Sequence, residues 1–148
     1  MKLVIQRVAR AEVRVGGSRV ASSGPGLLIL VGVGVDDRPE EPTKLAEKAY
    51  QLRIFEDGEG KMNLSLADVG GEVVVVPQFT LYGDTSRGRR PSWIRAAPPD
   101  VAEERVEEFA EALASLGARV HRGAFREHME VELVNDGPVT LVLEGRGP

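Results

Sequence analysis

Residues 26–34 of this chain read Gly-Leu-Leu-Ile-Leu-Val-Gly-Val-Gly and carry no polar side chain. A strand with one face in water alternates apolar and polar residues, so a run this uniformly apolar predicts a central strand buried on both faces. The longest apolar run, residues 27–35, has nine residues, which is far too few to cross a membrane. We therefore expect a protein built around one covered β-sheet, with no membrane partner.

Further strands are predicted on both sides of this run from alternating patterns and turn residues. Gly16-Gly17 is a two-residue hairpin signal, and Pro77 marks the end of another buried strand. The expected strands cover residues 4–8, 11–15, 18–22, 26–34, 73–76, 119–121, 131–134 and 139–143.

The hydrophobic period changes to that of a helix at two places. Apolar side chains fall at helical spacing over residues 45–52, with Thr43 as the expected N-cap. A longer helix is expected over residues 101–116. Its capping residues should be Asp100 and Glu103 in a capping box, and Gly117 at the C′ position.

Two main helices among these strands predict an α/β domain of the α+β type, with a mostly antiparallel or barrel-like β core. At 148 residues the chain fits one domain, spanning residues 1–148. Residues 144–148 are expected to form a flexible tail.

The chain contains no cysteine, which excludes disulfides and a cysteine nucleophile and suits a reducing compartment. Its first residues lack the features of a signal peptide, so a cytoplasmic location is expected. His121 and His128 are the only histidines, too few for a zinc site, and neither a metal nor a cofactor is predicted. Gly32-Val-Gly34 is not a dinucleotide-binding fingerprint, because Asp37 occupies the position of the third glycine.

Residues 86–95 hold four arginines and no acid, in a chain whose net charge is −4. Glycine and proline break this segment into a loop, and Trp93 adds a flat aromatic face. The guanidinium groups of Arg87, Arg89 and Arg90 could bind phosphate, while an aromatic face can stack a base. On these residues alone, nucleic-acid contact and a plain exposed basic loop stay equally open.

Two further segments are unusual for a purely structural role. Gln78 and Thr80 follow a predicted buried strand, where backbone N–H groups lose their ladder partners and can face a ligand. Gly137-Pro138 directly precedes another strand, and an X-Pro bond is where a cis peptide is tolerated. Each segment taken alone also fits an ordinary turn.

Taken together, five segments resemble the D-aminoacyl-tRNA deacylase family, in order and spacing, over nearly the whole chain. They are Ile5-Gln-Arg-Val8, Gly60-Lys-Met-Asn63, Gln78-Phe-Thr-Leu81, Arg90-Pro-Ser92 and Asn135-Asp-Gly-Pro-Val-Thr140. The resemblance implies a hydrolase that cleaves the ester of D-aminoacyl-tRNA, and that of mischarged glycyl-tRNA, as chirality proofreading in translation. It also implies a homodimer with active sites at the subunit interface.

The resemblance further implies how an L-amino acid is rejected. Gly137-Pro138 would carry a cis peptide and insert its carbonyl groups into the partner's pocket, where they exclude an L side chain. Arg7 would help to hold this Gly-Pro loop in place.

Substrate contacts are implied in the same way. The terminal adenosine of tRNA would lie near Gln78, Phe79 and Thr80, and the N–H groups of Phe79 and Thr80 would stabilise the oxyanion. Phe125 and Met129 would contact the base, and the Arg87, Arg89 and Arg90 loop would contact the tRNA.

One departure from the family changes the expected mechanism. The family usually has serine where this chain has Pro77, so no side-chain hydroxyl is essential there. Thr80 is the nearest hydroxyl, but no activating base lies near it in the sequence. We therefore expect the 2′-hydroxyl of the terminal ribose to help activate water. Two alternatives stay open, a non-catalytic nucleic-acid-binding protein of the same fold and a serine-type esterase for small molecules.

Overall fold

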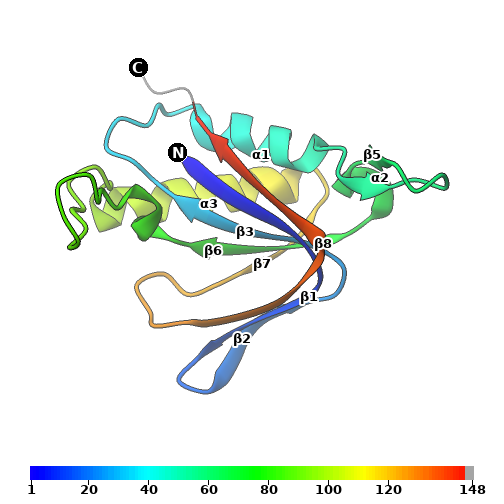
Figure 1. Cartoon of the computed structure of the whole chain (residues 1–148), viewed down its shortest axis with the longest axis horizontal. Coiled ribbons are helices and arrows are strands. Elements are labelled where there is room, and N and C mark those ends of the chain that lie inside the picture. The colour runs from blue at the N-terminus through cyan, green and yellow to red at the C-terminus, as the bar shows by residue number, and fades with distance from the viewer. Residues whose placement is uncertain (146–148) are drawn as a thin grey trace.

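The computed structural model describes residues 1–145, which form one curled β-sheet with two long helices on one of its faces (Figure 1). The sheet has six strands in the order β2-β1-β3-β6-β7, and β8 pairs with β1. The strands of this sheet are β1 (Lys2–Val15), β2 (Ser18–Ser23), β3 (Gly26–Gly32), β6 (Glu72–Pro77), β7 (Arg119–Arg122) and β8 (Glu130–Glu144). The long helices are α1 (Glu41–Gln51) and α3 (Pro99–Ser115).

Strand β1 joins the two halves of the curled sheet. Its first half pairs antiparallel with β3, and its second half pairs antiparallel with β2 across the predicted Gly16-Gly17 turn. Strand β8 runs antiparallel beside β1 over both halves, so the two long strands bend together (Figure 1).

Strands β3, β6 and β7 lie parallel to one another. The chain returns from β3 to β6 through a segment that includes α1, and from β6 to β7 through one that includes α3. Parallel neighbours require such crossover connections. The α+β class and the strand-rich core are confirmed, and the sheet proves to be mixed rather than purely antiparallel.

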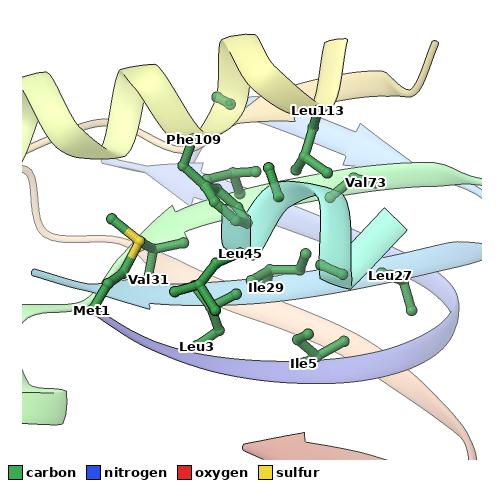
Figure 2. Close-up of a cluster of buried hydrophobic side chains, with 14 of the residues drawn as sticks. Met1, Leu3, Ile5, Leu27, Ile29, Val31, Leu45, Val73, Phe109 and Leu113 are labelled. Atoms are coloured by element: carbon green, nitrogen blue, oxygen red, sulfur yellow. The ribbon is translucent and has the colours of Figure 1, made fainter. Parts of the chain in front are cut away.

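Both faces of the central strands are buried, as the apolar run predicts. One face packs under the helices, where Phe109 and Leu113 of α3 belong to the same buried cluster as Leu27 and Ile29 of β3 (Figure 2). The other face packs inside the curl. That second cluster contains Val8, Ala11, Val13, Ala21, Leu28, Val74 and Val76.

A small unit beside α1 was not predicted. It consists of the two-stranded sheet of β4 (Phe55–Glu56) and β5 (Met62–Leu64), followed by the short helix α2 (Leu66–Val69). Ser65 and Asp68 form a reciprocal capping box at the start of α2, and Gly70 ends it with a φ of 63°. The Ser-x-x-Asp spacing followed by glycine was the available signal for this helix.

Several predicted boundaries were wrong for identifiable reasons. The strands expected at 4–8 and 11–15 form one continuous strand, β1, because β8 pairs with both parts. The strands expected at 131–134 and 139–143 likewise form one strand, β8, because both pair with β1.

The expected helix caps also differ from the structure. Helix α1 begins before the expected N-cap, because Pro42 fits the first helical turn. Its N-cap is therefore Glu40, and Thr43 lies inside the helix. Asp100 lies in the first turn of α3, and the N-cap Pro98 leaves no side-chain cap. Gly117 follows the C-cap Leu116 with a φ of 109°, as expected for the C′ position.

The predicted flexible tail is only partly within the described residues. Glu144 ends β8, and the Gly145 N–H donates to the Met1 carbonyl at 2.7 Å. Residues 146–148 lie outside the described part of the chain.

Candidate active site

A cavity of about 1070 Å³ opens where the three parallel strands end. Its walls come from Val33 and Val35 after β3, from Pro77 and Gln78 at the end of β6, and from the turn at residues 125–129 after β7. Ligands commonly bind at the carboxyl ends of parallel strands, because the connecting loops gather there. The parallel pairing therefore brings together three segments that are far apart in the sequence.

The inner wall of this cavity is apolar. It is formed by Val31, Val33, Val76, Ala97, Ala102, Val106, Phe125 and Met129. A volume and lining of this kind suit a flat apolar group as large as a nucleoside.

The segment after β6 places two backbone donors at the cavity. The 3₁₀-helix η1 (Phe79–Tyr82) begins directly after Gln78, whose backbone is non-helical with φ −146° and ψ 79°. The Phe79 and Thr80 N–H groups open this helix, and neither has a hydrogen-bond acceptor among residues 1–145. Gln78 and Phe79 line the cavity, and the Gln78 amide donates to the Thr80 hydroxyl. These N–H groups are free to bind a ligand oxygen.

Tyr82 anchors η1 from beneath. Its ring is buried against Gly34, where a Cβ atom would come within 2.6 Å of it. The phenol donates to Asp37 Oδ1 at 3.3 Å, and Asp37 Oδ2 accepts from the Gly34 N–H at 2.8 Å. Burial, followed by the charge of Asp37, raises the pKa of Tyr82 well above its ordinary value. The phenol therefore stays protonated and keeps the helix in position.

The turn after β7 brings the two predicted base contacts into the cavity. Phe125 and Met129 both line it and are partly buried. The Gly123 N–H donates to the Val75 carbonyl at 2.9 Å, and the Ala124 N–H lies 3.3 Å from the Met129 sulfur. These contacts fix the turn against the end of β6.

The rim of the cavity is unusually apolar for an exposed surface. Phe79 and Trp93 pack edge to face with ring centroids 5.1 Å apart, yet they remain 56% and 42% exposed. Ile94 beside them is 80% exposed. Flat aromatic faces of this kind can cover a bound group.

Arg87, Arg89 and Arg90 lie on an exposed loop next to this rim. None of the three forms an ion pair with another residue in the described part of the chain. Asp84 at the base of the loop is held by its hydrogen bonds to Ser86, which lower the pKa of that carboxyl. The basic charge of the loop is thus available to an external anion.

The Gly137–Pro138 segment forms a bulge in β8. Four residues, from Asp136 to Val139, lie opposite Arg7 alone, between the pairs Val8–Asn135 and Gln6–Thr140. The Gly137–Pro138 peptide bond is cis, and both residues are exposed. This bulge is therefore a projecting loop on the outer surface, and we call it the Gly-Pro loop.

Two side chains fix the Gly-Pro loop. Buried Arg7 donates from Nε to the Asp136 carbonyl at 2.9 Å and from Nη1 to the Ile54 carbonyl at 2.6 Å. The Asn135 amide donates to the Val139 carbonyl and accepts from the Val139 N–H, at 2.9 and 3.0 Å. Arg7 therefore contacts the loop that it was expected to hold.

The structure thus gathers only part of the expected site within one chain. Gln78, Phe79, Phe125 and Met129 line the cavity, whereas the exposed Thr80, which follows Phe79, does not. Gly137, Pro138 and Arg7 do not line it. The sequence analysis missed Tyr82, whose role depends on contacts with distant residues, and Arg126, which also lines the cavity.

Neither histidine belongs to a metal cluster. His121 Nε2 lies 2.8 Å from Glu72 Oε1, on the sheet, and His128 lines the cavity. Within residues 1–145 no three His, Asp or Glu side chains are placed to hold a metal ion.

Among the described residues, 1–145, every helix is too short or too polar to cross a membrane.

Fold and site together define a class: an α+β protein with an apolar cavity at the ends of its parallel strands and free backbone donors at the cavity edge. A family model described as D-Tyr-tRNA(Tyr) deacylase matches residues 4–144. The chain belongs to this deacylase family, as the sequence resemblance indicated.

Individual relatives agree with this assignment. D-aminoacyl-tRNA deacylases of Heliobacterium modesticaldum and Thermosipho africanus are 56% and 53% identical to this chain, over 99% of it and 98% of each relative. The solved structure of a c-Myc DNA Unwinding Element Binding Protein has a TM-score of 0.93 and 37% identity, covering 99% of this chain and 100% of that one. A probable eukaryotic D-amino acid tRNA deacylase shares the fold, with a TM-score of 0.79 at 17% identity over 96% and 97% of the two chains.

Proposed function

We propose that this protein hydrolyses the ester of D-aminoacyl-tRNA, and that of mischarged glycyl-tRNA, in the cytoplasm. The observation that carries the proposal is the pair of free N–H groups at Phe79 and Thr80 beside an apolar cavity of nucleoside size. Family membership and the names of the relatives support the same substrate class.

The terminal adenosine occupies the cavity in this proposal. Its base lies against Phe125 and Met129, and Gln78 lies beside its ribose. The aminoacyl ester then reaches the start of η1, where the Phe79 and Thr80 amides donate to the ester carbonyl oxygen. Donors that are fixed before the reaction stabilise the negative charge that develops on this oxygen.

The reaction is an addition of water followed by loss of the ribose oxygen. Water attacks the carbonyl carbon and gives up a proton, and the bond from that carbon to the ribose oxygen breaks. The ribose oxygen takes a proton, which releases the free amino acid and tRNA. Pro77 offers no hydroxyl, and the Thr80 hydroxyl accepts a hydrogen bond from Gln78 rather than lying near a base. The 2′-hydroxyl of the substrate is the group we assign to activating the water.

Rejection of L substrates requires a second copy of the chain. The Gly-Pro loop projects from the sheet and does not line its own chain's cavity. In a homodimer this loop enters the partner's cavity, and its carbonyl oxygens occupy the space that an L side chain would need. A D side chain points away, and glycine has no side chain to exclude.

The first test measures ester loss with the purified protein. Incubation with D-aminoacyl-tRNA and glycyl-tRNA should release the amino acid, whereas L-aminoacyl-tRNA should stay intact. Hydrolysis of D and L esters alike, blocked by serine-directed reagents, would point instead to a serine-type esterase.

The second test separates the two hydroxyls. Thr80→Ala should slow deacylation only severalfold, whereas a substrate with a 2′-deoxy terminal adenosine should react at least about a hundredfold more slowly. Full activity on the deoxy substrate would rule out the substrate-assisted mechanism.

A second candidate function is binding of nucleic acid without catalysis. The relative named for binding a DNA unwinding element is 37% identical, and Arg87, Arg89 and Arg90 lie on an exposed loop without an ion-pair partner among residues 1–145. This candidate predicts tight, salt-sensitive binding of nucleic acid with no turnover of either D or L ester. In our proposal the same loop contacts the tRNA backbone.

A further inference from the structure

Arg126 has a backbone conformation that its residue type disfavours. Its φ is 64°, and it is the only non-glycine residue with a positive φ among residues 1–145. Side chains with a Cβ atom rarely adopt this left-handed region, whereas glycine adopts it freely. A non-glycine residue in this conformation points to a role for its side chain there.

The surroundings of Arg126 identify that role. It lines the cavity next to Phe125 in the turn that is closed by the Glu127 N–H donating to the Ala124 carbonyl at 3.4 Å. Its side chain is exposed, and its guanidinium has no hydrogen-bond or ion-pair partner in the described part of the chain. The turn therefore holds a free cation at the cavity, one residue from the predicted base contact.

The chemistry of the proposed substrate provides the anion. A nucleoside whose base contacts Phe125 is joined through its 5′ oxygen to a phosphodiester, which must leave the cavity at its mouth. A guanidinium group donates two parallel hydrogen bonds to phosphate oxygens, which makes arginine well suited to this contact.

We propose that Arg126 binds the 5′-phosphate of the 3′-terminal adenosine and so sets how deeply the nucleotide enters the cavity. This inference rests on the proposed function. Glu127 also lines the cavity, and its carboxylate opposes the bound phosphate. Arg126 is thus expected to strengthen phosphate binding and Glu127 to weaken it, which makes Glu127 a matched control.

A binding test that needs no hydrolysis uses adenosine and adenosine 5′-monophosphate as probes, measured by calorimetry. The wild-type protein should bind the monophosphate more tightly than adenosine. Arg126→Gly should remove this preference while leaving adenosine affinity unchanged, and it should melt no lower than wild type because glycine suits the backbone. Equal preference for the monophosphate in both proteins would overturn the inference.

Kinetics provide the second test. Arg126→Gly should raise KM for D-aminoacyl-tRNA about fivefold to tenfold with kcat little changed, and lower the salt dependence of log(kcat/KM) by about 0.7, as expected for one lost phosphate contact. Arg126→Lys should keep the salt slope, and Glu127→Gln should lower KM. An unchanged KM and slope in Arg126→Gly would contradict the phosphate contact. A wild-type protein that does not deacylate would instead contradict the proposed function, while the probe binding would still decide the role of Arg126.

Discussion

At the scale of single residues, the proposed chemistry depends on a few side chains and N–H groups. Arg7 is buried and satisfies two carbonyl groups of distant segments. Phe79 and Thr80 contribute backbone groups, while the ring of Phe79 is mostly exposed. Substitutions can therefore separate backbone roles from side-chain roles.

Phe79→Pro tests the backbone donor directly. Proline removes the N–H at the first position of η1, where no intrahelical bond is lost, and Gln78 before it lies outside the α region that a following proline disfavours. We expect kcat to fall about 10²–10³-fold, the usual effect of losing one oxyanion donor. Phe79→Ala, which keeps the N–H and loses the ring, is the control and should retain most of kcat. Equal losses in both variants would assign the effect to the ring.

Arg7→Lys tests the support of the Gly-Pro loop. Lysine keeps the charge but lacks the planar guanidinium group that donates to both the Asp136 and Ile54 carbonyls. One of these two carbonyl groups is therefore left without a hydrogen bond. The free energy of unfolding in urea should fall by about 1–3 kcal/mol, and the ratio of D to L hydrolysis should fall as well. Arg10→Lys at an exposed ion pair is the control, with an expected change below about 0.5 kcal/mol. A stable Arg7→Lys protein with unchanged selectivity would contradict the supporting role.

At the scale of elements, one carboxylate connects β6, β7 and the turn between β2 and β3, at the end of the sheet opposite to the cavity. Glu72 at the start of β6 accepts from the Gly24 N–H at 2.9 Å and lies 2.8 Å from His121 Nε2 of β7. These hydrogen bonds, His121 first, lower the pKa of Glu72. A second close contact occurs at Gly26, where a Cβ atom would come within 1.8 Å of the Glu72 carbonyl oxygen.

The lowered pKa of Glu72 predicts a pH-dependent contribution to stability. The pKa of Glu72 is lower in the folded protein than in the unfolded chain, so the ionised carboxylate stabilises the folded state. This contribution to the free energy of unfolding is complete when the pH is above the ordinary pKa of 4.5, and it is lost as the pH falls through the folded pKa. Urea unfolding of wild type and Glu72→Gln should therefore differ at pH 7 and converge in acid. A difference that stays constant down to pH 3 would contradict this role.

At the scale of the whole molecule, the cavity and the Gly-Pro loop lie on different parts of one chain. A second copy can bring them together, and it would also cover apolar side chains that the long strands leave exposed. Val131, Val134 and Val142 of β8 are 37–63% exposed. Covered apolar surface of this kind favours association.

Mixed dimers test which subunit supplies the loop. Gly137→Ala distorts the loop, since Gly137 has a φ of 152° and an added Cβ would lie 2.6 Å from the Val139 nitrogen. A heterodimer of Gly137→Ala and Phe79→Pro subunits, isolated with two affinity tags, keeps one competent cavity, which belongs to the Gly137→Ala subunit. If the partner supplies the loop, this heterodimer should cleave D and reject L substrates, unlike the Gly137→Ala homodimer. Loss of selectivity in the heterodimer would show that each loop acts within its own chain.

The local features of this protein, such as single strands and turns, can be predicted from the sequence alone. Uniform apolarity made β3 a strand buried on both faces, and paired glycines made the β1–β2 turn. Short motifs indicated the family, and the resemblance pointed to four residues that line the cavity, namely Gln78, Phe79, Phe125 and Met129. These features could be predicted because each depends on residues that are adjacent or regularly spaced.

The way in which distant segments combine is visible only in the tertiary structure. Exposed Ala9 and Arg10 interrupt the apolar alternation, yet β1 continues through them because β8 pairs on both sides. The parallel pairing of β3, β6 and β7 collects three loops around one cavity, and it places the Gly-Pro loop outside that cavity. Strand pairing is made by backbone groups that every residue carries, so side-chain patterns alone do not specify which strands become neighbours.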